Sequence, residues 1–152
     1  MKKLILVNLI ILILFALLYF LVDLENKDKV EEKIVTKIID GDTIIVQGGE
    51  TIRLLGVDCD ERGKECYNEA KEYVESELLG RKVKLEKIEE DKDRYGRSLR
   101  YIILNNSNLN IQLISEGYCI ARIENIDNYK EEIISAENFA ILNKVGCKWS
   151  NV

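Results

Sequence analysis

The sequence predicts a mainly β domain with helices, of the α+β class, behind a single N-terminal hydrophobic helix. Three observations predict this arrangement. Residues 4–22 form an unbroken apolar run, residues 34–57 are rich in β-branched side chains, and residues 64–79 change to the spacing of a helix. The chain has 152 residues, which is enough for one domain with a hydrophobic core and does not require two.

The N-terminal apolar run extends from Leu4 to Val22, and Asn8 is its only strongly polar residue. As a helix it would be about 28 Å long, close to the hydrocarbon thickness of a bilayer. A cleavable signal peptide has a shorter apolar region and a small-x-small cleavage site, whereas this run continues into Asp23 and Leu24. A core helix that is apolar on all faces would need a larger protein around it. We therefore expect residues 1–22 to form an uncleaved membrane anchor.

Charges at the two ends of this run predict its orientation. Lys2 and Lys3 precede it and Asp23 and Glu25 follow it, so the positive-inside rule places the rest of the chain outside the cytoplasm. We expect a single-pass membrane protein with an extracytoplasmic domain, or a secreted protein if the segment is cleaved. Residues 23–32 are almost wholly charged and predict a hydrated tether before a domain that covers residues 33–152.

Five strands and about three helices are predicted after the tether. The strands are expected at residues 34–39, 43–47, 51–57, 81–88 and 98–104, where β-branched or alternating apolar residues occur. The helices are expected at residues 64–79, 108–116 and 128–144, each followed within two residues by glycine. Three strands, a helix, two strands and then helices is the order of a five-stranded OB-fold barrel, whose open face often binds nucleic acid.

Composition excludes several kinds of catalyst. The sequence has no histidine, which excludes hydrolases with a histidine base and most zinc hydrolases as they are usually built. Lys2 and Lys3 account for two of the 22 basic residues, so the chain after the apolar run carries 20 against all 27 acidic residues, a net charge of −7. Because polyanion binding normally relies on a basic surface, we expect any nucleic-acid enzyme here to use a metal cation and a few arginines.

Two carboxylates, Asp40 and Asp42, stand at the junction of the first two predicted strands, in the sequence IDGDT. Taken alone, a DGD sequence is most often a turn. It does not begin an EF-hand loop, because Ile45 occupies the sixth position, where glycine is needed, and Thr51 the twelfth, where glutamate is needed.

A second cluster lies in the sequence RLLGVDCDE, where a strand ends in the acids Asp58, Asp60 and Glu61. A divalent cation would relieve their mutual repulsion, and oxygen ligands suit calcium. Arg53 lies within the same strand, and by itself a salt bridge with one of these acids is the simpler explanation for it.

A third cluster, DRYGR, precedes the fifth predicted strand and contains Arg94, Tyr95 and Arg97. By itself it could be a solvated charged turn. A fixed guanidinium at this place could also make bidentate contacts with a phosphate group.

Taken together, the three clusters resemble the staphylococcal nuclease family, in the same order and at the same places relative to the strands. The resemblance covers about residues 35–150 and includes a C-terminal Lys148-Trp149-Ser150. It implies calcium-dependent hydrolysis of DNA or RNA by a monomer with one calcium ion. A single cluster is a weak signal, but the series would seldom arise by chance.

The resemblance also implies the role of each residue. Asp42 and Asp58 would bind calcium through their carboxylates, and Cys59 would contribute only its backbone carbonyl. Glu61 would act as general base on the attacking water. Arg53 and Arg97 would clamp the phosphate and stabilise the negative charge of the phosphorane-like transition state.

Three further residues have lesser assignments by the same resemblance. Arg94 and Tyr95 match positions that contact a terminal phosphate, and Asp40 is expected to support its loop. Asp60 departs from the family pattern, because proline usually stands there, and Cys59 stands where threonine is common.

The four cysteines, Cys59, Cys66, Cys119 and Cys147, form no CxxC pair, which makes a zinc site improbable, and their even number suits disulfides outside the cytoplasm. Of the three connectivities we expect Cys59–Cys66 and Cys119–Cys147.

Two other classes of function stay open. A barrel of this family without catalysis could hold nucleic acid or a protein, although the presence of both arginines, both metal-binding carboxylates and the glutamate argues against it. A structural membrane-anchored protein with an acidic outer domain would explain the charge balance but leaves the paired arginines unexplained.

Overall fold

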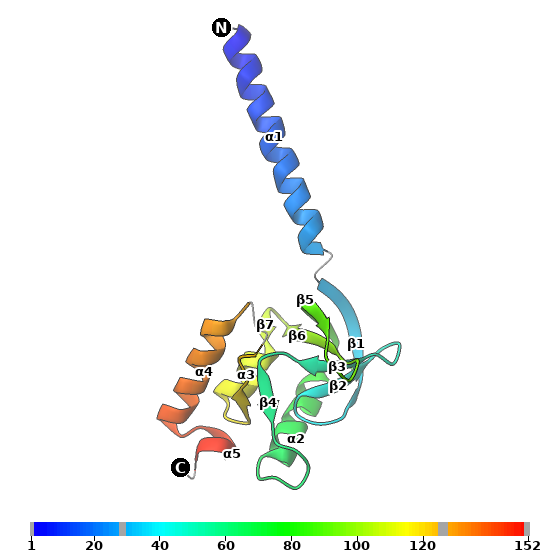
Figure 1. Ribbon diagram of the computed structural model, residues 1–152, viewed down its shortest axis with the longest axis vertical. Helices are drawn as coiled ribbons and strands as arrows, with labels where there is room; N and C mark the ends of the chain where they lie inside the picture. Colours follow the sequence, from blue (N-terminus) through cyan, green and yellow to red (C-terminus); the bar gives the residue numbers. More distant parts are fainter. Residues whose placement is uncertain (1, 28–29, 125–127, 151–152) are drawn as a thin grey trace. The chain divides into compact units, whose positions relative to one another are not determined.

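The computed structural model describes residues 2–27, 30–124 and 128–150 (Figure 1). It divides into two units, Met1–Glu31 and Glu32–Val152, which we describe separately. Two residues of the predicted tether, 28 and 29, lie outside the described residues.

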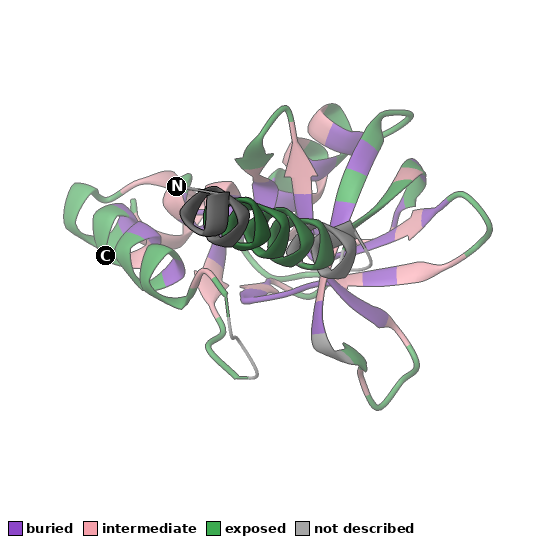
Figure 2. Ribbon diagram, turned by 90° about the horizontal axis from the view of Figure 1, so that it is seen from above, coloured by how far each residue is buried: buried purple, intermediate pink, exposed green. Residues whose placement is uncertain are grey.

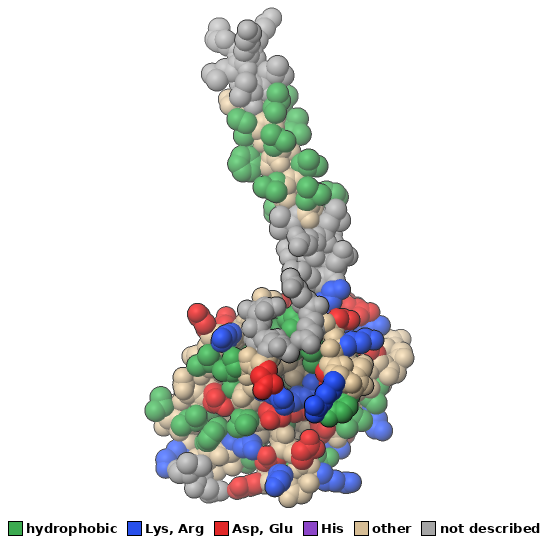
Figure 3. Space-filling view, in the orientation of Figure 1, with side chains coloured by type: hydrophobic (Ala, Val, Ile, Leu, Met, Phe, Trp, Pro, Cys, Tyr) green, Lys and Arg blue, Asp and Glu red, His purple; other side chains and the backbone are tan. Residues whose placement is uncertain are grey.

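The first unit contains one helix, α1 (Lys2–Lys27). Its described side chains are those of residues 8–21, so both ends of the predicted apolar anchor lie outside them. Within residues 9–21 large hydrophobic side chains are exposed (Figure 3). Among the residues that the structure describes, no helix combines the length and the apolar character needed to cross a membrane.

The second unit is built on a closed barrel of five strands. They are β1 (Val30–Ile38), β2 (Thr43–Val46), β3 (Thr51–Leu54), β5 (Lys82–Lys92) and β6 (Ser98–Leu104). The strands pair in the order β3-β2-β1-β5-β6, and a parallel pairing of β3 with β6 closes the barrel. The prediction of a five-stranded OB-fold barrel with helices is confirmed.

Short elements complete the unit. They are α2 (Tyr67–Leu78), β7 (Ser107–Asn108), α3 (Leu109–Ser115), α4 (Lys130–Asn143) and α5 (Gly146–Trp149), together with β4 (Val57–Cys59) and β8 (Cys119–Ala121). β4 and β8 form a separate two-stranded sheet. The helices α2, α3 and α4 correspond to the three that were predicted, and α5 is an additional single turn.

The predicted third strand, residues 51–57, is wrong in its extent. Gly56 adopts φ 74°, a left-handed conformation that glycine takes without steric cost, and this turn separates β3 from β4. Leu55 still donates a backbone hydrogen bond to the Arg100 carbonyl of β6 at 3.0 Å. The chain then leaves the barrel, so that β4 can pair with β8.

The predicted tether, residues 23–32, also differs in the structure. Its first five residues continue α1 to Lys27, and β1 already begins at Val30. Extension of β1 is consistent with its position beside β5, because Glu32 forms an ion pair with Lys82.

Apolar side chains form the core of this unit. Figure 2 marks the buried residues along the strands and helices. The barrel strands bury, among others, Val35, Ile44, Ile52, Leu54, Leu85 and Tyr101. Helix α2 buries Ala70, Val74 and Leu78 at the helical spacing read from the sequence, and α4 buries Ile133, Ala136 and Ala140.

A buried amide joins α3 to the barrel wall. Asn110 has no exposed surface, and its Nδ2 donates to the Leu55 carbonyl at 2.8 Å and the Arg100 carbonyl at 3.2 Å. Its Oδ1 accepts a hydrogen bond from the Ile102 N–H at 3.0 Å. These bonds satisfy buried polar groups and hold the chain where β3 ends and β4 begins.

Both predicted disulfide pairings are wrong. The structure joins Cys59 to Cys119 and Cys66 to Cys147, with Cα–Cα distances of 4.4 and 5.5 Å. Cys59 and Cys119 lie directly opposite each other in the β4–β8 pair. The pairing of β4 with β8 brings Cys119, which is distant in the sequence, to Cys59.

Candidate functional site

Asp42 is the buried centre of the site, with 7% of its surface exposed. It lies in the loop between β1 and β2, where its N–H donates to the carboxylate of Asp40 at 3.1 Å. Asp40 therefore supports the loop, as expected. The Asp42 carboxylate accepts hydrogen bonds from the Cys59 N–H at 2.9 Å and the Thr43 hydroxyl at 3.0 Å.

Glycine is needed beside Asp42 because the loop packs closely against its neighbours. A Cβ on Gly41 would lie 2.8 Å from the Ala70 side chain and 2.9 Å from that of Cys59. The DGD sequence thus combines a turn with a close approach to α2 and β4, which brings the second aspartate under the end of β3.

Arg53 lies between two carboxylates. Alternation along β3 buries Ile52 and Leu54 and turns Arg53 outward. Its guanidinium is 3.0 Å from the Asp42 carboxylate and 3.3 Å from that of Asp58, which β4 presents between two buried residues. The salt bridge that the sequence suggested as the simpler explanation is therefore present, and it joins both predicted metal ligands.

Burial and charge act in opposite directions on Asp42. Burial raises the pKa of its carboxyl, and the nearby Arg53 and the Cys59 N–H offset this only in part, so the pKa is raised to about 6. The negative charge of Asp42 is therefore only partly balanced by its neighbours, and a second cation would stabilise the ionised carboxylate.

The DRYGR turn fixes Arg97 by means of Asp93. The Asp93 carboxylate accepts the backbone N–H groups of Tyr95 and Arg97 at 2.9 and 3.0 Å, and Arg97 Nε donates to it at 2.7 Å. Burial raises the pKa of Asp93, but these hydrogen bonds outweigh it and hold the pKa below its usual value. Arg97 Nη1 also donates to the Thr43 hydroxyl at 3.3 Å, which links the turn to the Asp42 loop.

Arg94 and Tyr95 lie at the exposed edge of the same turn. Tyr95 is 69% exposed, and the guanidinium groups of Arg94 and Arg97 lie 4.8 and 5.5 Å from the centre of its ring. Such cation–π contacts orient flexible arginines without using their hydrogen-bond donors.

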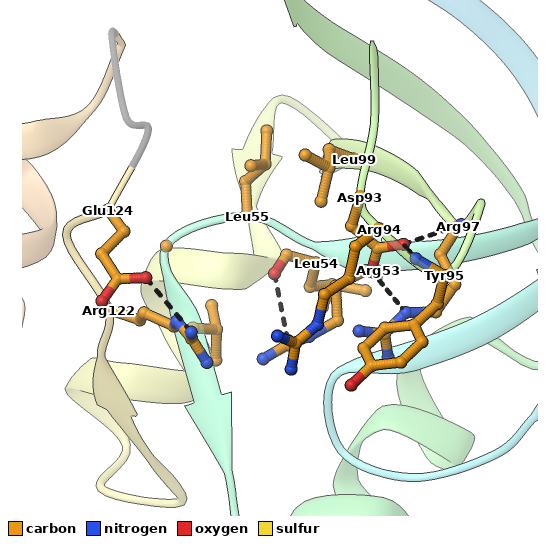
Figure 4. A pocket seen from close by; sticks show the side chains of 12 residues that line it. Arg53, Leu54, Leu55, Asp93, Arg94, Tyr95, Arg97, Leu99, Arg122 and Glu124 are labelled. Carbon is orange, nitrogen blue, oxygen red and sulfur yellow. Dashed lines mark hydrogen bonds and ion pairs between the residues drawn. The ribbon is translucent and has the colours of Figure 1, made fainter. Parts of the chain in front are cut away.

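A pocket of about 360 Å³ opens over these residues (Figure 4). Among the seven arginines of the sequence, four line it, namely Arg53, Arg94, Arg97 and Arg122. Basic side chains therefore concentrate at one place on an acidic domain, which suits an anionic ligand.

The sequence analysis assigned no role to three of the charged residues that line the pocket, Asp93, Arg122 and Glu124. Asp93 was part of the DRYGR cluster, and its position two residues before Tyr95 is the spacing of a local carboxylate turn. Arg122 and Glu124 belong to no motif, and only the pairing of β4 with β8 brings them to the site.

Glu61 lies on an exposed loop between β4 and α2, where its carbonyl accepts the Lys64 N–H at 3.0 Å. It is not among the described residues that line the pocket. The structure thus brings Asp42, Arg53, Asp58 and Arg97 together and places Glu61 on the neighbouring loop.

The donors present fit a hard divalent cation. Asp42 and Asp58 direct oxygen atoms to two nitrogens of the same guanidinium, and carboxylate oxygens are ligands that a hard divalent cation prefers. Over the described part of the chain, no group of three or more histidine, cysteine, aspartate or glutamate side chains could hold a metal ion. Backbone carbonyl groups and water would have to supply the other ligands.

Known proteins are similar to this sequence. A family described as "Staphylococcal nuclease homologue" matches residues 51–151. A thermonuclease of Staphylococcus hyicus is 35% identical over 138 residues, covering 84% of this chain and 80% of the relative. An uncharacterized protein of Methanocaldococcus jannaschii is 36% identical over 149 residues, covering 77% and 72%. A thermonuclease of Staphylococcus intermedius is 37% identical over 101 residues, covering 60% of each chain. The chain belongs to the staphylococcal nuclease family.

Proposed function

We propose that this protein is a calcium-dependent nuclease that hydrolyses phosphodiester bonds of DNA, RNA or both, with internal cleavage as the expected mode. Its family and its two thermonuclease relatives support the nuclease assignment. The observation that carries the proposal is the convergence of Arg53, Arg97, Asp42 and Asp58. Arg53 and Arg97 line the pocket, and Arg53 contacts the carboxylates of both Asp42 and Asp58. Fixed positive charges of this kind can stabilise the negative charge that develops during hydrolysis of a phosphodiester.

Arg53 and Arg97 would bind the scissile phosphate and stabilise the charge that develops on its oxygens. Both are preorganised, Arg53 by burial to 11% exposure and Arg97 by Asp93. Because their donors are fixed before the reaction, little reorganisation is needed in the transition state.

Glu61 would accept the proton of the attacking water as general base. Its loop begins at Cys59 and returns at Cys66, and both cysteines are bonded to distant parts of the fold. Asp42, Asp58 and the Cys59 carbonyl would hold calcium, which when bound supplies a Lewis acid for a phosphoryl oxygen.

We also propose that residues 4–22 anchor the protein in a membrane, with the catalytic domain outside the cytoplasm. The apolar run, the flanking charges and the helical conformation of α1 support this location. Proteolysis of intact cells, followed by detection of the domain, tests it. Protection of the domain in intact cells and its degradation only after lysis would contradict an outside location.

Cleavage assays test the nuclease proposal. The full chain in detergent is incubated with single-stranded DNA and with RNA, in calcium and in chelator, beside Glu61→Gln and Arg97→Ala. Glu69→Gln on α2 and Arg81→Ala are matched controls, because both residues are exposed and absent from the residues that line the pocket. Calcium-dependent cleavage that is lost in the two site variants and kept in the controls supports the proposal.

The alternative is a catalytically inactive module that binds nucleic acid or protein. The ion pairs that engage Arg53 with Asp42 and Asp58 favour it, since they compete with a phosphate. If no divalent cation supports cleavage and the protein still binds an oligonucleotide, the binding module is the correct assignment and the nuclease proposal is wrong.

A further inference from the structure

Arg122 enters the pocket from a part of the fold that no motif marks. It follows β8, and its backbone N–H donates to the Gly56 carbonyl at 2.9 Å. That bond continues the register of β8 with β4, in which Ala121 lies opposite Val57. The backbone of Arg122 is therefore fixed at the turn that follows β3, beside the predicted site.

The side chain of Arg122 lies across the pocket from the DRYGR turn. Figure 4 shows Arg122 on one side of Arg53, and Tyr95 and Arg97 on the other. Arg53 and Arg97 are the residues assigned to the scissile phosphate. Arg122 is thus the guanidinium on the opposite wall from Arg94 and Tyr95.

Arg122 is available to a ligand. Its side chain is 52% exposed, compared with 11% for Arg53, so half of its surface faces solvent. It donates to the Glu124 carboxylate at 3.2 Å and lies 4.0 Å from the Asp58 carboxylate. Exposed pairs of this kind hold an arginine in place only weakly, and a phosphate can compete with them.

We propose that Arg122 binds a phosphate next to the scissile one, so that the pocket prefers a polynucleotide strand to an isolated phosphodiester. A strand presents phosphates in series, and the four arginines line the pocket from both walls. Because the chain after the apolar run carries a net charge of −7, each arginine at the pocket also offsets repulsion of the substrate. This inference rests on the proposed nuclease function.

Glu124 has a defined part in this arrangement. It neutralises Arg122 in the free protein and competes with the phosphate for the same guanidinium. Removal of its charge is therefore expected to strengthen binding of a strand, whereas removal of the Arg122 charge weakens it. A purely structural ion pair would make the two substitutions act alike.

Kinetics on two substrates test the inference, with the full chain in detergent and in calcium. One is a single-stranded DNA oligonucleotide, and the other is a nucleoside aryl phosphodiester with a single phosphate. Arg122→Gln is expected to lower kcat/KM on the oligonucleotide about tenfold. On the aryl diester it should change kcat/KM less than twofold, because no second phosphate is present.

The salt dependence of kcat/KM distinguishes a lost phosphate contact from a loss of protein stability, because a less stable fold does not change the number of phosphate contacts. Loss of one phosphate contact to a single strand should make the slope of log kcat/KM against log salt less steep by about 0.7. Arg122→Lys keeps the charge and should keep the slope, and Glu124→Gln should raise kcat/KM on the oligonucleotide. Arg81→Gln is the matched control, as Arg81 is paired with Glu77 away from the pocket.

The outcomes separate this inference from the proposed function. If Arg122→Gln lowers kcat/KM equally on both substrates, or leaves the salt slope unchanged, the inference about Arg122 is wrong. Cleavage by the wild type would still support the nuclease proposal. When no cleavage occurs the nuclease proposal fails, and fluorescence anisotropy of the bound oligonucleotide across salt still tests Arg122. In that case a slope that Arg122→Gln leaves unchanged overturns the inference.

Discussion

Asp60 forms an ion pair with Lys148, in which the carboxylate lies 2.6 Å from the ammonium group. The other carboxylate oxygen of Asp60 accepts the Cys66 N–H at 3.0 Å. Asp60 thus joins two parts of the fold through its side chain, and we call its contacts with Lys148 and Cys66 the clamp. The clamp ties the loop that carries Glu61 to α5 at the C-terminal end of the domain.

Removing the clamp is expected to destabilise the domain moderately. Asp60→Asn and Lys148→Gln should each lower the free energy of unfolding by about 1 kcal/mol, since the pair is mostly shielded from solvent. Urea unfolding of both variants and of the double variant checks this. The two losses should not add, and additive losses would show that the two residues do not act as a pair.

The same pair predicts a dependence of stability on pH. Burial raises the pKa of Asp60, but the hydrogen bonds from Lys148 and the Cys66 N–H lower it by more. The net effect is a pKa below that of a free aspartate. Its contribution is therefore present above the unfolded pKa of about 3.9 and is lost as the pH falls through the lower folded pKa. The difference in stability between wild type and Asp60→Asn should shrink in acid; a difference that grows there would refute the assignment.

Two disulfides enclose the Glu61 loop, since Cys59 is bonded to Cys119 and Cys66 to Cys147. They close loops of 60 and 81 residues, so loss of either one is expected to cost about 4 kcal/mol by chain entropy. Thermal unfolding of the Cys66→Ser/Cys147→Ser double variant measures the stability lost with the Cys66–Cys147 bond. Four free thiols in the unreduced, denatured wild type would contradict both bonds.

Local pattern was sufficient to predict most of the barrel. Runs of β-branched residues marked the strands, and the spacing of Ala70, Val74 and Leu78 marked α2, because these signals depend only on nearby residues. The break at Gly56 was missed because buried residues lie on both sides of it. The strand β8 was missed because it has three residues and depends on a distant partner.

The candidate site was predictable to the extent that its residues lie in motifs. Arg53 contacts Asp42 and Asp58, and Arg97 reaches the Asp42 loop through Thr43, while the roles of these residues stay predictions. Arg122 and the true partners of the cysteines could not be found in this way. Their positions depend on contacts between β4, β8 and α5, which leave no periodic signal in the sequence.

Asn110 is expected to be one of the most sensitive polar residues in the domain. Asn110→Ala would leave the Leu55 carbonyl and the Ile102 N–H without their side-chain partner in a buried environment. We expect a loss of about 3 kcal/mol in the free energy of unfolding. Urea unfolding measures it, with the exposed Asn68→Ala as matched control. A loss below 1 kcal/mol would mean that water replaces the amide.

Calcium binding should depend on pH through Asp42. Burial raises the pKa of this carboxyl to about 6, and a cation binds only its ionised form. The apparent affinity for calcium should therefore be nearly constant above pH 7 and fall about tenfold per pH unit below pH 6. The stability of the calcium-free domain should change with pH in the opposite direction. Because the pKa of Asp42 is raised on folding, the domain should become less stable as the pH rises from about 4 to 6.

Isothermal titration calorimetry of the full chain at pH 5, 6 and 7 measures this dependence. Asp42→Asn should bind calcium weakly at every pH and should lose the dependence between pH 5 and 7. Asp91→Asn is the matched control, because Asp91 lies on β5 and pairs with Arg100 at 2.7 Å. An affinity that stays constant from pH 7 to pH 5 would show that Asp42 does not bind the ion, since its proton must leave before calcium can occupy the same oxygen atoms.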